Sequence, residues 1–180
     1  MNTPEPARAV LITGAPGVGK SEVAPRVAAA LPGQVAVIDL DALGAIRPWR
    51  ADPDVLGLIA TNFGLVLGEY LRWGQRSFVV VGVMVPGKLY DAVTGHLTRL
   101  AVDFDCYGLV AEPEEIARRI NGDRRFRDTS GRLQDIPLND LIATIEKVQL
   151  VDTSGAGPHE VAETIVQREI ALGAGVPEAP

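Results

Sequence analysis

The stretch VLITGAPGVGKSEV, residues 10–23, decides the fold. Its residues 14–21 fit the pattern G-x-x-x-x-G-K-[ST], and they end an apolar run, ARAVLITG, that is typical of a central strand buried on both faces. A glycine-rich turn from a strand into a helix presents backbone N–H groups at the positive end of the helix dipole, where few Cβ atoms obstruct an anion. The stretch therefore predicts a phosphate-binding loop made of Gly14, Ala15, Pro16, Gly17, Val18, Gly19, Lys20 and Ser21.

Two side chains of this loop have predicted roles. Lys20 is expected to reach the β- and γ-phosphates of a nucleotide, and the Ser21 hydroxyl is expected to ligate Mg²⁺. A chance match is the alternative in a glycine-rich chain. The motif follows an apolar strand and opens a helix, however, and that context is what a functional loop requires.

Composition limits the classes of protein that need consideration. The chain has 180 residues, 47% of them hydrophobic and 22% charged, so we expect one domain over residues 1–175 and a disordered tail over 176–180. The net charge of −6 gives no general attraction for a phosphate backbone, so we expect no nucleic-acid partner. A single cysteine, no basic leader and no apolar run long enough for a bilayer favour a cytoplasmic protein, monomeric or homodimeric, without a membrane span.

Strand and helix patterns alternate along the chain. We expect strands at 7–14, 34–41, 77–85, 101–111 and 148–154, and helices at 20–31, 53–73, 86–100, 112–120, 137–147 and 157–173. Residues 123–137 are polar and aperiodic, which indicates a surface loop. The pattern predicts an α/β fold of three layers, in which helices cover both faces of a mostly parallel sheet and ligands bind beyond the carboxyl ends of the strands.

Two carboxylates, Asp39 and Asp41, end the second predicted strand. If the strand persists, both point the same way. One could then hold Mg²⁺ through water while the other orients or deprotonates an attacking hydroxyl. Alternatively, Asp41 caps a helix and Asp39 is merely exposed. We favour the catalytic interpretation, with Asp39 near the metal, because the third strand runs into VVVGVMVPG and offers no Walker-B acid.

Cationic residues gather in two segments. A lid over residues 122–136 or so would bring arginines onto a transferring phosphate and exclude water, although a solvated charged face is the alternative. The segment GAIRPWRADPD lies on the expected substrate side and would suit an anion or a ring-bearing substrate; a surface loop is the alternative there. The arginine run comprises Arg118, Arg119, Arg124, Arg125, Arg127 and Arg132, and the substrate candidates are Arg47, Trp49 and Arg50.

From about residue 8 to 172 the chain resembles the small P-loop kinases of the nucleoside monophosphate kinase-like group, whose members include shikimate kinase, gluconate kinase and chloramphenicol phosphotransferase. The resemblance rests on GAPGVGKS, IDLD, ARRINGDRR and VDTSG. It implies a P-loop NTPase sheet of five strands in the order 2-3-1-4-5, and Asp39 or Asp41 as the base or metal carboxylate. It also implies an adenine stacked on an arginine near Arg119 and lined by Asp152, Thr153 and Ser154, with phosphates contacted by Arg124 or Arg125.

One departure concerns the substrate. Shikimate kinases carry a glycine-rich turn after the third strand, whereas this chain has Gly82 followed by VMVP, so we do not expect shikimate as the acceptor. The leading hypothesis is transfer of the γ-phosphoryl group of Mg-ATP to a hydroxyl of a small molecule. The alternatives are an ATP-binding regulatory module without transfer activity, since the Walker-B acid is missing, and a kinase of a nucleic-acid end that uses the arginine segment as its contact.

Overall fold

The computed structural model describes residues 6–46, 52–123 and 130–173. Several sequence predictions lie outside these residues: the tail, residues 124–129 of the lid, the substrate candidates Arg47, Trp49 and Arg50, and the phosphate contacts Arg124 and Arg125. For these the structure adds no position, and they stay predictions.

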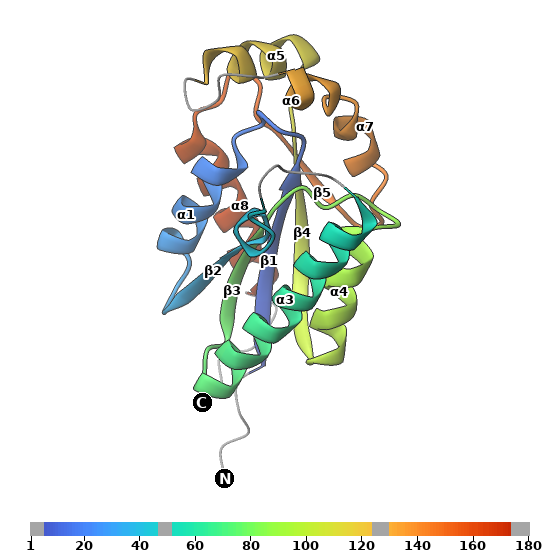
Figure 1. Cartoon of the computed structure of the whole chain (residues 1–180). Coiled ribbons are helices and arrows are strands. Elements are labelled where there is room, and N and C mark those ends of the chain that lie inside the picture. The colour runs from blue at the N-terminus through green and yellow to red at the C-terminus, as the bar shows by residue number, and fades with distance from the viewer. Residues whose placement is uncertain (1–5, 47–51, 124–129, 174–180) are drawn as a thin grey trace.

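A single sheet forms the centre of the molecule (Figure 1). Its strands are β1 (Ala7–Gly14), β2 (Val35–Asp39), β3 (Ser77–Val81), β4 (Val102–Val110) and β5 (Gln149–Asp152). Their order is β2-β3-β1-β4-β5, and every neighbouring pair is parallel. The predicted order is therefore confirmed, and the sheet is fully parallel because each connection contains a helix that carries the chain back to the starting edge.

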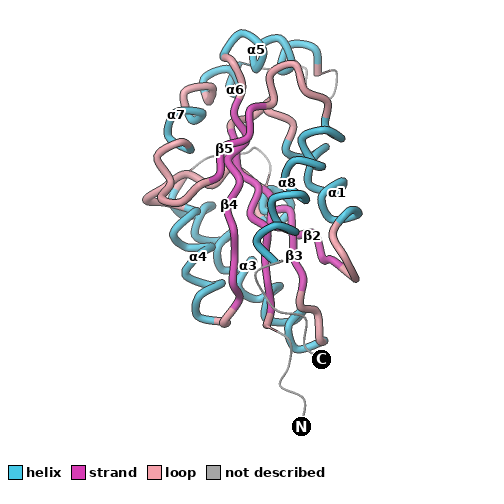
Figure 2. Tube along the Cα trace, turned by 180° about the vertical axis from the view of Figure 1, so that it is seen from behind, coloured by secondary structure: helices cyan, strands magenta, loops and turns pink. Residues whose placement is uncertain are grey.

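Helices cover both faces of the sheet, as Figures 1 and 2 show from opposite sides. On one face, α3 (Pro53–Trp73) and α4 (Leu89–Arg99) pack on Ala9 and Leu11 of β1. On the other face, α1 (Lys20–Ala30) and α8 (Pro158–Gly173) pack on Val10 and Ile12. Alternate residues of β1 thus serve two separate cores, which is why that strand reads as a continuous apolar run.

Short helices gather where the strands end. α2 (Leu40–Leu43) follows β2 directly, and α5 (Pro113–Gly122), α6 (Ser130–Gln134) and α7 (Leu138–Ile142) follow β4. Figure 1 shows α5 and α6 beyond the carboxyl end of the sheet, at the top of the view. This edge therefore carries most of the short elements, and it is the edge where the phosphate-binding loop lies.

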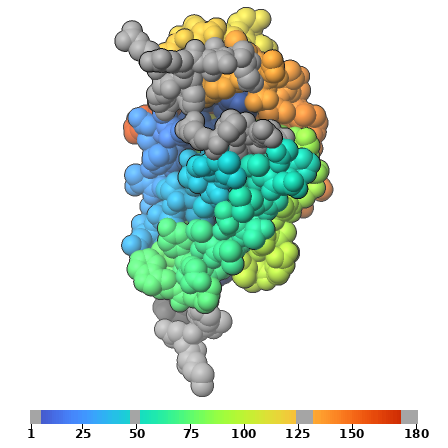
Figure 3. Space-filling model, viewed as in Figure 1, coloured from blue at the N-terminus to red at the C-terminus, as the bar shows by residue number. Residues whose placement is uncertain are grey.

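α3 confirms its predicted ends and shows a largely exposed surface. Asp52 caps it by accepting a hydrogen bond from the Val55 N–H at 2.9 Å, and Gly74 ends it with φ of 102°. By length and composition alone α3 could cross a bilayer, yet here it packs on the sheet as one layer of the fold. It lies on the surface of the face shown in Figure 3.

Several boundaries differ from the predictions. β2 ends at Asp39 instead of residue 41, because the Asp39 side chain caps α2. β3 ends at Val81 instead of residue 85, and the residues beyond it leave the sheet. The segment predicted as a loop contains α6, and the helix predicted over 137–147 is the shorter α7.

Candidate active site

The glycines of the phosphate-binding loop are required by both conformation and space. Gly17 and Gly19 have φ of 89° and 99°, a region that favours glycine. A Cβ on Gly14 would lie 2.7 Å from the Leu109 carbonyl oxygen, and one on Gly17 would lie 2.8 Å from Cγ1 of Ile120. The sequence motif therefore corresponds to a tight backbone turn that leads into α1 at Lys20, and a phosphate chain could approach this backbone closely.

Lys20 lies folded against its own loop. Its Nζ donates hydrogen bonds to the carbonyl oxygens of Gly14, at 2.8 Å, and Ala15, at 3.0 Å. The residue is 8% exposed, and this burial lowers the pKa of its ammonium group from 10.5 to about 8, although the negative charges of Asp41 and Asp39 oppose the shift. A buried cation thus stands at the loop with both acids close enough to act on it.

We expect the affinity of the protein for Mg-ATP to depend on pH through Lys20. The charged ammonium binds phosphate, and the free protein loses that charge as pH rises through about 8. Affinity should be flat below that pH and should fall above it, by up to about tenfold per pH unit, until the pKa of the bound state is reached. Titration calorimetry from pH 6.5 to 9.5 measures this; a flat wild-type profile would contradict it, and Lys20→Met should be flat throughout.

Asp39 and Asp41 have different environments. One Asp39 oxygen, Oδ1, accepts a hydrogen bond from the Asp41 N–H at 2.9 Å and caps α2. Asp41 lies in the first turn of that helix. Part of its side chain reaches solvent, but the surrounding protein removes enough water to raise its carboxyl pKa, against the opposing charge of Lys20. The prediction that both acids project from one strand is wrong, as is the alternative that Asp41 is the cap.

α2 is anchored to α3. The Asn62 side-chain amide donates a hydrogen bond to the Leu43 carbonyl oxygen at 2.9 Å. Gly44, which follows α2, lies so close to α3 that a Cβ there would be 2.3 Å from Cγ1 of Ile59. These contacts fix the helix that carries Asp41. In the sequence, Asn62 is a polar residue on the otherwise apolar face of α3, and this was the signal for its hydrogen bond to Leu43.

A buried clasp, which sequence analysis missed, joins Thr13 to Met84. The Met84 N–H donates to Thr13 Oγ1 at 2.9 Å, and Thr13 Oγ1 donates to the Met84 carbonyl oxygen at 3.2 Å. Both residues are fully buried. The only signal in the sequence was a hydroxyl within the apolar run before Gly14. The clasp ties the segment after β3 to the strand that precedes the phosphate-binding loop.

We expect Thr13→Val to destabilise the protein by about 2 kcal/mol, because it preserves shape but leaves the buried backbone N–H of Met84 without its acceptor. Urea denaturation measures the change. Thr13→Ser keeps the hydroxyl and should recover most of the loss. A matched control is Thr164→Val, whose exposed hydroxyl bonds to the Glu160 carbonyl oxygen of its own helix and which should stay within about 0.5 kcal/mol of wild type. Equal stability of Thr13→Val and wild type would show that the clasp contributes nothing.

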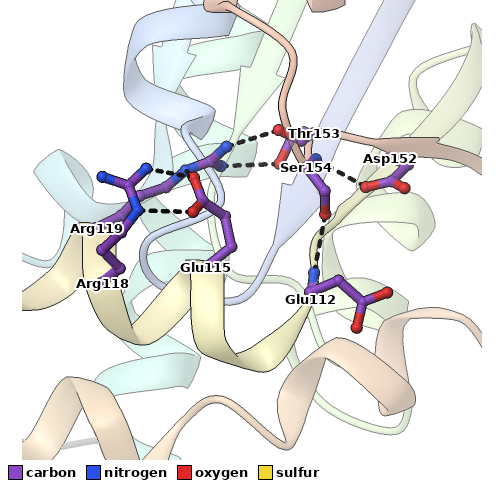
Figure 4. Close-up of polar contacts among 7 residues, drawn as sticks. All are labelled: Glu112, Glu115, Arg118, Arg119, Asp152, Thr153 and Ser154. Carbon is purple, nitrogen blue, oxygen red and sulfur yellow. Dashed lines mark hydrogen bonds and ion pairs between the residues drawn. The ribbon is translucent and has the colours of Figure 1, made fainter.

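The residues predicted to hold a nucleotide base do lie together (Figure 4). The Arg119 guanidinium donates to Thr153 Oγ1 at 3.0 Å and to the Thr153 carbonyl oxygen at 2.6 Å, and its Nε donates to Glu115 at 2.7 Å. Hydrogen bonds from Arg118 and Arg119 lower the pKa of the Glu115 carboxyl to about 2. Arg119 is therefore held as a planar cation between α5 and the turn after β5. A flat aromatic base could stack on such a plane.

The turn after β5 is fixed by its own hydrogen bonds. The Ser154 N–H donates to Asp152 Oδ1 at 2.8 Å, and Ser154 Oγ accepts from the Glu112 N–H at 3.0 Å (Figure 4). Asp152, Thr153 and Ser154 thus link β5 to the start of α5. All four residues predicted for the base pocket meet at one place, and their contact with adenine stays a prediction.

One arginine of the predicted lid lies near the loop. Arg132 of α6 pairs with Asp123 at 3.2 Å. Its charge lowers the pKa values of both Lys20 and Asp41. Arg132 belongs to the arginine run, but sequence analysis did not single it out as a phosphate contact. Its position near both groups adds it to the candidate residues.

A magnesium ion fits the donors present. Among the described residues, no group of three or more His, Cys, Asp or Glu side chains could hold a metal by itself. Mg²⁺ commonly takes one or two protein oxygens and completes its shell with water and phosphate. The hydroxyl of the exposed Ser21 and the carboxylate of Asp39 are donors of the right kind, and the predicted magnesium site is chemically consistent with them.

A glycine-rich loop and its lysine at the carboxyl edge of a parallel 2-3-1-4-5 sheet, with acids following the second strand, define the P-loop kinase-like fold. Solved structures share it. The chain matches a gluconokinase from Sinorhizobium meliloti with a TM-score of 0.73 and 17% identity, over 94% of this chain and 95% of that one. A sugar kinase from Janibacter matches with a TM-score of 0.68 and 17% identity, over 92% and 94%.

A third similar structure is a tunicamycin resistance protein from Deinococcus radiodurans, with a TM-score of 0.63 and 20% identity over 97% of this chain and 99% of that one. No family model and no curated protein matches the chain. At these identities the likeness establishes the fold. The resemblance drawn from the sequence is thereby confirmed for the fold, over nearly the whole chain.

Proposed function

We propose that this protein is an ATP-dependent phosphotransferase that moves the γ-phosphoryl group of Mg-ATP to a hydroxyl of a small molecule. One observation carries the proposal: Lys20 of the phosphate-binding loop and Asp41 of α2 lie close enough to shift the pKa of one another. A phosphate cation and a carboxylate with a raised pKa are the pair that phosphoryl transfer to a hydroxyl needs. The kinases of the same fold support this class of reaction.

In the proposed reaction the loop binds the phosphates and Lys20 leaves its carbonyl partners to contact them. Ser21 and Asp39 would hold Mg²⁺, which neutralises charge on the phosphates when bound. Asp41 accepts the proton of the acceptor hydroxyl while that oxygen bonds to the γ-phosphorus. The bond from the γ-phosphorus to the bridging oxygen breaks, and ADP leaves with its electron pair.

The assignment of the two acids follows from their hydrogen bonds. Asp39 already uses one oxygen as the cap of α2, so it is suited to a fixed role near the metal. Asp41 lies two residues further along the chain, in the first turn of α2, and its raised pKa makes it a stronger proton acceptor than an ordinary aspartate. We therefore propose Asp41 as the base and Asp39 as the metal carboxylate. Arg119 with the turn after β5 would receive the adenine, and Arg132 would assist the phosphates.

The remaining features are proposed on sequence grounds. Arg47, Trp49 and Arg50 would contact the acceptor, and Arg124 and Arg125 would contact phosphate from the lid. We further propose that the protein is a cytoplasmic monomer or homodimer. We propose no nucleic-acid partner, since the net charge of −6 gives no general attraction for a phosphate backbone.

Coupled ADP-release assays with Mg-ATP and a panel of hydroxylated metabolites, nucleosides and antibiotics test the proposal. Lys147→Met, at an exposed lysine before β5, is the matched control for Lys20→Met. Turnover that is lost only in the Lys20 variant supports a kinase. Tight Mg-ATP binding without any transfer would favour the regulatory module, and salt-sensitive phosphorylation of an oligonucleotide end would favour the third candidate.

A further inference from the structure

The segment Gly82–Pro86, which we call the strap, follows β3, the strand that lies between β2 with its acids and β1 with the phosphate-binding loop. It begins one residue after Val81, whose register partner on β2 is Asp39. The Gly82 N–H donates to the Ile12 carbonyl oxygen of β1 at 3.2 Å. On its other side Gly82 lies so close to α2 that a Cβ there would be 2.9 Å from Cβ of Leu40. The strap therefore borders the strand ends on which the proposed reaction depends.

The clasp with Thr13 fixes the middle of the strap. Met84 is fully buried in the core beneath α3, and both of its backbone polar groups bond to Thr13. Burial alternates along the strap: Gly82 and Met84 are buried, whereas Val83 and Val85 are partly exposed. Met84 fills the core beneath α3, whereas the two valines on either side of it keep part of their surface in solvent. Val83 and Val85 are therefore open to solvent just beyond the carboxyl end of β3, the edge of the sheet at which the phosphate-binding loop also lies.

We propose, building on the phosphotransferase function above, that Val83 and Val85 form an apolar wall of the acceptor site, and that the acceptor presents an apolar face beside its reacting hydroxyl. The strap sequence Gly-Val-Met-Val-Pro offers no side-chain hydrogen-bonding group. A polyhydroxylated or polyanionic face against this wall would lose its hydration without gaining partners, which is costly. An alkyl or ring face loses no hydrogen bonds there and gains from burial.

Binding of a matched ligand series tests the wall. The probes are methyl, butyl and hexyl β-glucosides, which share their hydroxyls and differ only in apolar surface, titrated into protein that holds Mg²⁺ and a non-hydrolysable ATP analogue. Burial of one methylene is worth up to about fourfold in affinity. We expect at least about a tenfold gain from methyl to butyl. Equal affinity along the series would overturn the proposal.

Variants locate the binding. The double variant Val83→Asn with Val85→Asn should abolish the gain, while Val37→Asn, at a valine 41% exposed on the edge strand β2, should keep it. The surface also has an apolar hollow on α3 that is lined in part by Leu65 and Trp73, and Trp73→Ser tests whether the probes bind there instead. A gain that survives the double variant, or that disappears in Trp73→Ser, would overturn the proposal.

The outcome separates this inference from the proposed function. Thermal melts first establish that each variant is folded. One outcome is an affinity gain along the glucoside series that depends on the strap, with no phosphoryl transfer to any compound of the panel. That outcome would contradict the proposed reaction and support the apolar wall. Transfer that favours acceptors without an apolar face, and that the double variant does not change, would count against the wall while leaving the reaction in place.

Discussion

The Lys20→Met variant is expected to lose phosphoryl transfer by about 100- to 1,000-fold. Removal of one preorganised donor that stabilises charge in the transition state costs about this much. Methionine fills a similar volume but cannot contact the phosphates. The measurement is turnover with saturating Mg-ATP and an acceptor found in the panel, with Lys147→Met as the control. Unchanged turnover in Lys20→Met would refute the assignment of the site.

The same variant should be more stable than the wild type. Because the pKa of Lys20 is lowered to about 8 in the folded protein, the unfolded chain binds more protons between about pH 8 and 10.5. The charged lysine therefore costs stability below pH 8, by up to about 3 kcal/mol. Loss of its hydrogen bonds to Gly14 and Ala15 offsets part of the gain. We expect a net stabilisation of about 1–3 kcal/mol at pH 7.

Urea denaturation at pH 7 and pH 9.5 measures this effect. The advantage of Lys20→Met should shrink at the higher pH, because the wild-type lysine is by then largely neutral in the folded state and no longer pays the burial of its charge. Lys147→Met should show neither the gain at pH 7 nor the dependence on pH. A Lys20→Met protein less stable than the wild type at pH 7 would mean that the hydrogen bonds outweigh the burial.

The Asp41→Asn variant is expected to reduce turnover by about 100- to 10,000-fold, the usual contribution of a general base. The affinity for Mg-ATP should change by only a few-fold, since the proposed role of Asp41 concerns the acceptor hydroxyl. Asparagine preserves shape and removes the proton acceptor. Pre-steady-state turnover and calorimetric binding separate the two effects. A large loss of affinity with normal turnover would assign Asp41 to the nucleotide or the metal.

Asp39→Asn is the matched comparison. Its amide oxygen can still accept the Asp41 N–H, so α2 should stay capped. We expect a higher Mg²⁺ requirement with a smaller effect on turnover at saturating Mg²⁺. If Asp39→Asn instead lost turnover and Asp41→Asn instead raised the Mg²⁺ requirement, Asp39 would be the base and Asp41 the metal carboxylate. Normal behaviour of both variants would reduce the acids to structural residues.

Local patterns predicted much of this structure. The strand before Gly14, both ends of α3 and the alternation of strands with helices depend on neighbouring residues, and each is confirmed. The end of β2 was mispredicted for a physical reason. IDLD is compatible with a continuing strand, and only the hydrogen bond from the Asp41 N–H to the Asp39 carboxylate turns the chain into α2. The hydrogen bond of the Asp39 side chain is an alternative to strand pairing of the backbone, and the apolar periodicity does not show which of the two forms.

By itself the sequence determined the glycine-rich loop after β1 and the parallel α/β architecture, because a glycine motif and apolar periodicity act over short distances. Tertiary structure alone decided the clasp between Thr13 and Met84, which are 71 residues apart, and the hydrogen bond from Arg119 to Thr153. It also decided the low pKa of Lys20. Hydrogen bonds across the chain and loss of water depend on which distant atoms surround a group, and only the folded packing supplies them.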